Sequence, residues 1–224
     1  MFERLKKLFQ PDHSAALAVW ARREALLFEQ VPSGDRLVWT GQLEGHPFRM
    51  ESAPPQRDYL RGHELRLRLD LALSDDWSIM VMNRELNQHL EQAAYSGYTD
   101  AVQTTARLKL TEEMRWLAMY TEVGWSRMNS DFWARFVVLT EHREDAQAWL
   151  SAPLVQALMS LPAAPDGHQM PLVMMLTRGR LYLRTQHQRE DTLKLDLFLA
   201  LARSAAQSAQ ALPPERNLLP PPQP

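Results

Sequence analysis

The chain contains no cysteine, and this absence removes several kinds of chemistry together. Disulfide bonds, thiolate nucleophiles, and zinc or iron–sulfur sites held by cysteine are all excluded. A reducing compartment is compatible with such a composition, so we expect a cytoplasmic protein.

Long apolar runs and a large net charge are also missing. No stretch approaches the ~18 apolar residues of a membrane-spanning helix, and no apolar region of the kind found in secretory signals follows the basic start. The formal net charge is -2, which gives no broad positive field for phosphates. We therefore expect neither a transmembrane segment nor a nucleic-acid partner.

Familiar catalytic and metal-binding motifs are absent as well. The chain has no phosphate-binding glycine loop, no His-Glu-x-x-His zinc helix, no calcium loop and no Gly-x-Ser-x-Gly elbow. Glu85 and His89 lie one helical turn apart, but two ligands are too few for a metal site. The sequence predicts no cofactor and favours a non-catalytic protein over an enzyme.

Two strands with alternating side chains are the clearest positive signal. After Gly62, leucines alternate with charged residues over 64–71, and a shorter alternation follows Gly179. Such alternation is typical of an antiparallel sheet with one covered face. The leucines fall three and five residues after Gly62 but two and four after Gly179, so the two strands are not copies of one unit.

The remaining elements follow from caps, turns and periodicity. Strands are predicted at 36–43, 47–52, 62–73, 77–82, 132–140, 172–176 and 180–185. Helices are predicted at 12–30, 83–94, 111–119, 142–161 and 191–211. The fourth helix should break near Pro153, with Ser151 as a new N-cap, and the 172–185 hairpin should turn through a type I turn with Gly179 in the left-handed region.

Together these elements predict an α+β fold. We expect an antiparallel sheet of hairpins with helices packed mainly on one face. Residues 1–211 form one domain, either undivided or split into subdomains at 31–125 and 126–211. Residues 212–224 hold six prolines and should be a disordered tail.

The densest group of functional side chains lies between Gln56 and Glu64. Arginine and histidine there can grip an anion while the carboxylates orient them. The alternative is a set of ion pairs at the rim of the sheet, worth only ~0–1 kcal/mol each. The candidate binding residues are Arg57, Asp58, Tyr59, Arg61, His63 and Glu64.

The first nine residues form a short amphipathic segment. Its apolar residues are Phe2, Leu5, Leu8 and Phe9. With the basic residues between them, they can contact an anionic membrane surface. Alternatively, they dock on the protein's own core or on a partner.

Part of the chain resembles bacterial domains of unknown function. The resemblance rests on the segment Phe132–Thr140, the acidic helix start in His142–Leu150 and the Arg178–Leu183 turn and strand. It covers the C-terminal part of the chain from residue 132 and implies a strand, an apolar helix and a hairpin. It implies no activity.

These observations support a non-catalytic protein-interaction or accessory module that acts with another protein or as a homo-oligomer. One alternative is a regulator or enzyme that binds a small molecule or anion near Arg57, Arg61 and His63. A second alternative is a peripheral membrane protein attached through residues 1–9.

Overall fold

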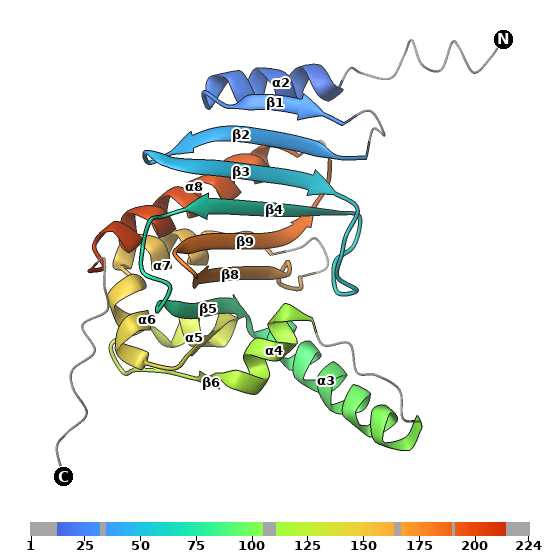
Figure 1. Cartoon of the computed structure of the whole chain (residues 1–224), viewed down its shortest axis with the longest axis vertical. Coiled ribbons are helices and arrows are strands. Elements are labelled where there is room, and N and C mark those ends of the chain that lie inside the picture. The colour runs from blue at the N-terminus through green and yellow to red at the C-terminus, as the bar shows by residue number, and fades with distance from the viewer. Residues whose placement is uncertain (1–12, 32–34, 105–110, 164–166, 190, 214–224) are drawn as a thin grey trace.

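The computed structural model describes residues 13–31, 35–104, 111–163, 167–189 and 191–213 (Figure 1). The predicted membrane contact of residues 1–9 and most of the predicted disordered tail lie outside these ranges. Among the described helices, none is both long and apolar enough to span a bilayer.

Helices and strands are interspersed along the described parts of the chain. The strands are β1 (Leu27–Gln30), β2 (Leu37–Leu43), β3 (His46–Ala53), β4 (His63–Asp70), β5 (Ser78–Asn83), β6 (Thr121–Glu122), β7 (Phe136–Thr140), β8 (Leu172–Thr177) and β9 (Arg180–His187). The helices are α2 (His13–Arg23), α3 (Arg84–Thr104), α4 (Glu112–Met119), α5 (Ser130–Arg135), α6 (Arg143–Trp149), α7 (Ala152–Met159) and α8 (Thr192–Gln210).

All these strands belong to one antiparallel sheet, which confirms the predicted α+β class. Their order is β1-β2-β3-β4-β9-β8-β5-β7-β6. The N-terminal meander β1–β4 pairs through β4 with the C-terminal strand β9. The middle of the chain supplies the other half of the sheet through β5, β7 and β6. The two ends of the chain thus build one half of the molecule together.

Helices cover the two faces of the sheet unequally. Leucines of β4 and β9 share one large core with α2, α5, α6, α7 and α8. On the opposite face, α3 and α4 pack mainly on apolar side chains of β5, β7 and β8, and Tyr182 of β9 lies at the edge of this smaller core. The helices therefore lie mainly on one face, and the second face is partly open.

The two strands that begin with Arg-Gly are neighbours in the sheet. Leu67 of β4 lies opposite Leu183 of β9, and Leu69 lies opposite Leu181. Antiparallel pairing brings both sets of leucines to the same face despite their different spacing from the glycines.

The turn before β9 differs from the predicted type I turn. Thr177 pairs with Arg180, so only Arg178 and Gly179 form the loop, with φ of 53° and 67°. Two consecutive positive φ angles fit the type I′ turn that matches the twist of a hairpin. Gly179 is required there, since a Cβ would lie 2.5 Å from the carbonyl oxygen of Leu73.

Two predicted elements are wrong in part. The helix predicted to run to residue 30 ends at Arg23, and β1 follows because Phe28 stacks on Trp39 of β2 with ring centroids 5.5 Å apart. The strand predicted at 132–140 begins only at Phe136, because Asn129 caps the short helix α5 in front of it.

Other predictions are confirmed. Thr111 caps α4 by accepting a hydrogen bond from the backbone N–H of Met114, and Ser151 caps α7 after a break from α6. Asp191 caps α8 in the same way through the N–H of Lys194. The helix predicted at 83–94 continues further, to Thr104.

Candidate functional site

A buried group of polar side chains joins α4 to the sheet. We call it the charged cluster, and its members are Arg57, Tyr59, Glu64, Glu113 and Arg184. Arg57 and Tyr59 come from the loop between β3 and β4. Glu64 belongs to β4, Glu113 to α4 and Arg184 to β9. Both carboxylates are 0% exposed. Charges withdrawn from water to this extent need partners, and the cluster supplies them.

Glu113 is the centre of the charged cluster. Its Oε2 lies 2.9 Å from Arg57 Nε, and its Oε1 accepts a hydrogen bond from the Tyr59 hydroxyl at 3.0 Å. Arg184 Nη1 donates to the same Oε1. Three donors from two separate segments therefore meet on one carboxylate, which fastens the start of α4 to the sheet.

Glu64 extends the charged cluster along β4. Its Oε1 lies 2.8 Å from Arg184 Nε, and its Oε2 accepts the backbone N–H of Gln56 at 2.7 Å. Arg66 Nε lies 3.9 Å from Glu64 Oε1 on the outer side. Arg184 thus bridges Glu64 and Glu113.

Burial and pairing compete in setting the ionisation of the charged cluster. Burial raises the pKa of Glu113, but Arg184, a backbone hydrogen bond and Arg57 outweigh it and hold that pKa below its usual value. Burial and the Glu113 carboxylate raise the pKa of Tyr59. Burial lowers the pKa of Arg184, and the neighbouring carboxylates raise it by more. These three groups stay in their usual charge states near neutral pH, which suits a structural junction better than proton transfer.

The polar face of the sheet continues outward from the charged cluster as a surface rich in arginine. We call this surface the arginine face; its guanidinium groups belong to Arg36, Arg49, Arg66, Arg68 and Arg180. Figure 1 looks onto it: β2, β3, β4 and β9 lie in front, α8 lies behind them, and no labelled helix crosses them. The arginine face is therefore the uncovered part of the second sheet face.

Two carboxylates are recessed among the arginines. Glu51 is 15% exposed and pairs with Arg66 at 2.9 Å, while Arg49 Nε donates to it at 2.7 Å. Asp70 accepts from Arg180 Nε at 2.7 Å. The register also places Glu29 of β1 on this face, opposite Val38. Five guanidinium groups thus stand against three carboxylates, so the arginine face has an excess of positive charge.

The structure places three of the predicted binding residues in the charged cluster. Arg57, Tyr59 and Glu64 have their polar atoms directed to cluster partners. Their interactions are buried beside α4, so these side chains do not form the exposed ion pairs at the sheet rim that the alternative prediction describes. Their partners Glu113 and Arg184 already occupy the positions that a bound anion or cation would take.

The other three predicted residues lie elsewhere. Asp58 and Arg61 line a shallow surface hollow beside Glu85 and His89 of α3. His63 lines a separate hollow at the end of β9. The structure divides the six residues among three environments, and a binding role for them stays a prediction.

Sequence reasoning misses Glu113 and Arg184. They lie 71 positions apart in the chain, and each has an ordinary local explanation. An acidic residue in a first helical turn suits the helix dipole, and an arginine at an alternating strand position suits solvent. The alternation of β9 places Arg184 on the polar face, but no local pattern connects it with α4.

Comparison of the chain with protein-family models, with curated proteins and with solved structures finds no match. The described residues also contain no group of three or more carboxylate or histidine side chains that could hold a metal ion.

Proposed function

We propose that the chain is a non-catalytic protein-interaction module whose arginine face docks an acidic segment of a partner protein. The observation that supports the proposal is an open cationic sheet face on a chain whose net charge is -2. The remaining surface carries the negative excess, so an acidic partner is attracted to one side and repelled from the others.

The pairing of β3 with β4 adds a second argument. Arg49 lies directly opposite Arg68, and their side chains are 46% and 50% exposed. Like charges in cross-strand positions destabilise a sheet. Ion pairs with Glu51 and Asp70 offset part of this repulsion, and a partner's carboxylate placed between the two guanidinium groups would offset more of it.

The chemistry of arginine supports recognition of carboxylates. Each guanidinium has five N–H donors, and Glu51 and Asp70 use only some of them. The remaining N–H groups can donate to carboxylate oxygens of a partner in the bidentate geometry that makes arginine common at interfaces.

A protein partner is favoured over a nucleic acid. Proteins that bind single strands place exposed aromatic rings among their basic side chains so that bases can stack. On this face Tyr182 is half-buried and packs against the core beneath α3 and α4. It offers no open ring surface of that kind.

The proposal can be tested with a fluorescent peptide of alternating Glu and Thr residues. We expect fluorescence anisotropy to show binding that weakens as salt is added. The double variant Arg49→Ala/Arg68→Ala should bind at least about tenfold more weakly, which corresponds to about 1.4 kcal/mol. Its stability should change by less than about 1 kcal/mol, because the loss of the repulsive pair offsets the loss of the exposed ion pairs with Glu51 and Asp70.

The matched control is Arg143→Ala, which removes an arginine that is 54% exposed on α6. Its affinity for the peptide should stay that of the unmodified chain. An equal loss in both variants, or no binding at all, would contradict the proposal. Tighter binding of a labelled single-stranded DNA that also depends on Arg49 and Arg68 would assign the face to nucleic acid instead.

A further inference from the structure

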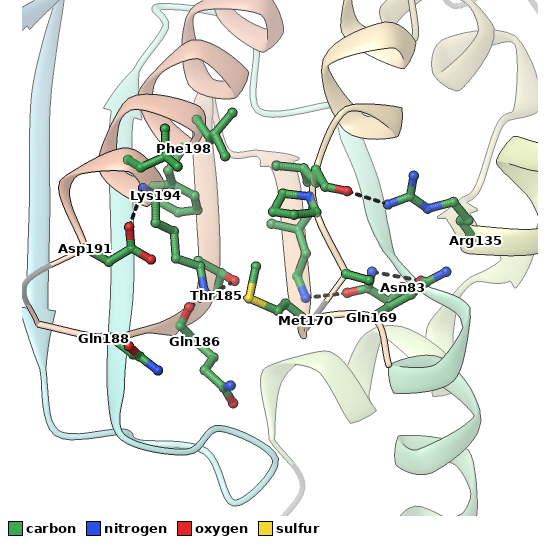
Figure 2. A pocket seen from close by; sticks show the side chains of 16 residues that line it. Asn83, Arg135, Gln169, Met170, Thr185, Gln186, Gln188, Asp191, Lys194 and Phe198 are labelled. Carbon is green, nitrogen blue, oxygen red and sulfur yellow. Dashed lines mark hydrogen bonds between the residues drawn. The ribbon is translucent and has the colours of Figure 1, made fainter. Parts of the chain in front are cut away.

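A second feature, on the other side of the sheet, is a cavity of about 290 Å³ at the start of α8. It lies between the first two turns of α8, the ends of β8 and β9, and residues 161–163 and 169–170 (Figure 2). Its size falls at the lower end of ligand pockets, which span ~300–1,000 Å³.

Several polar groups that line the cavity are already used by the fold. Asn83 Nδ2 donates to Gln169 Oε1 at 3.0 Å, and Thr185 Oγ1 donates to a backbone carbonyl at 2.7 Å. Both terminal nitrogens of Arg135 donate to backbone carbonyl oxygens, one to that of Met159 at the end of α7 and the other to that of Leu161 just after it. These groups hold the walls in place and leave few donors for a ligand.

Lys194 is different, because its ammonium group has no carboxylate partner among the described residues. Its Nζ lies 2.7 Å from the thioether sulfur of Met170, which is a weak acceptor. Asp191 sits one turn earlier and uses its carboxylate to cap α8 through the backbone N–H of Lys194. Burial lowers the pKa of the Lys194 amine, and the Asp191 charge opposes this only in part.

The rest of the cavity is mainly apolar. Leu197 and Phe198 of α8 line it together with Leu161 and Leu172, and Figure 2 shows that Lys194 and Phe198 come from the same helix. Leu193 also lines the cavity and is 68% exposed. Arg135 and Asp191 also line the cavity but bond to backbone groups of the fold. The site therefore offers a ligand the Lys194 ammonium and a large apolar wall.

We propose that this cavity binds a small amphipathic carboxylate, with the carboxylate on the Lys194 amine and the apolar body against Leu197 and Phe198. A monoanion fits better than a phosphate, because among the described lining residues Lys194 is the one cation not bonded to backbone carbonyls, and it cannot balance two charges. The apolar part of the ligand would gain free energy by leaving water. This proposal uses none of the residues of the arginine face and stands apart from the proposed docking of an acidic segment.

Octanoate is a suitable probe, with octan-1-ol as the uncharged molecule of the same length. Isothermal titration calorimetry should show octanoate binding to the unmodified chain. In Lys194→Met, which keeps the length of the side chain and removes its charge, octanoate should bind at least about tenfold more weakly. The affinity for octan-1-ol should change by less than about threefold, because the apolar wall is intact.

A second measurement decides the matter if the variant fails to fold. In the unmodified chain, nuclear Overhauser contacts should connect the octanoate chain with the side chains of Leu197 and Phe198. Contacts elsewhere, equal octanoate affinity in Lys194→Met, or no binding of octanoate would each overturn the proposal.

Discussion

The charged cluster around Glu113 and the cavity around Lys194 both withdraw ionisable groups from water, but they treat them in opposite ways. Glu113 receives three donors from Arg57, Tyr59 and Arg184. Among the described residues, the Lys194 ammonium donates only to the thioether sulfur of Met170. The first site pairs its carboxylates with guanidinium groups of the chain, whereas the ammonium of the second meets no carboxylate among the described residues.

This difference separates a structural role from a binding role. A buried charge that is fully paired holds its surroundings together. Removing one partner leaves the other charge buried without compensation, which destabilises the fold. A buried charge without a partner costs free energy in the folded chain, and that cost is recovered when a ligand brings the opposite charge.

The largest effect should follow from Glu113→Ala. This change leaves the guanidiniums of Arg57 and Arg184 without their shared carboxylate, and breaking a buried pair in this way costs about 3–5 kcal/mol. Urea denaturation should show this fall in the free energy of unfolding.

Glu122→Ala provides the control for that measurement. Glu122 is 43% exposed and pairs with Arg84 at 2.7 Å. An exposed pair contributes about 0–1 kcal/mol, so this variant should stay close to the unmodified chain. If Glu113→Ala loses no more than Glu122→Ala does, the charged cluster is not a structural junction.

The next effect concerns His187, which is fully buried near Lys194. Burial, the Lys194 charge and His63 lower its pKa from 6.5 to about 4, and Asp191 opposes them. Between about pH 6.5 and about pH 4, the folded chain therefore binds fewer protons at His187 than the unfolded chain does. Stability from this group is complete above its unfolded pKa and is lost as the pH falls through the interval.

The shift corresponds to about 3 kcal/mol. Between about pH 7 and about pH 4, the unmodified chain should lose that much more stability than His187→Leu, which has nothing to protonate there. Parallel urea denaturation curves at the two pH values measure the difference. Identical acid sensitivity in both chains would show that His187 is not held neutral by its surroundings.

The sequence predicts elements well where the signal is local. Alternation identifies β4 and β9, and the caps Thr111 and Ser151 mark helix starts because each acts on its own first turn. It fails at β1, where the contact of Phe28 with Trp39 overrides helical periodicity. A contact between distant segments decides that case.

The two candidate sites escape prediction for the same reason. The segment from Arg57 to Glu64 does contain three members of the charged cluster, but Glu113 and Arg184 join it only through the folded sheet and α4. Lys194 looks like an ordinary lysine in the first turn of a helix. Its burial arises because Met170 and its neighbours pack beside α8.

The smallest effect should be a gain in stability, and it tests the contrast most directly. Lys194→Met replaces an unpaired, partly buried ammonium with an apolar group of similar helix propensity. The free energy of unfolding should rise by about 1 kcal/mol in urea denaturation, opposite in sign to Glu113→Ala. A clear loss of stability would mean that the Lys194 charge already has a favourable environment in the folded chain. A gain, together with weaker octanoate binding, would show that the chain keeps this charge for a ligand at the expense of its own stability.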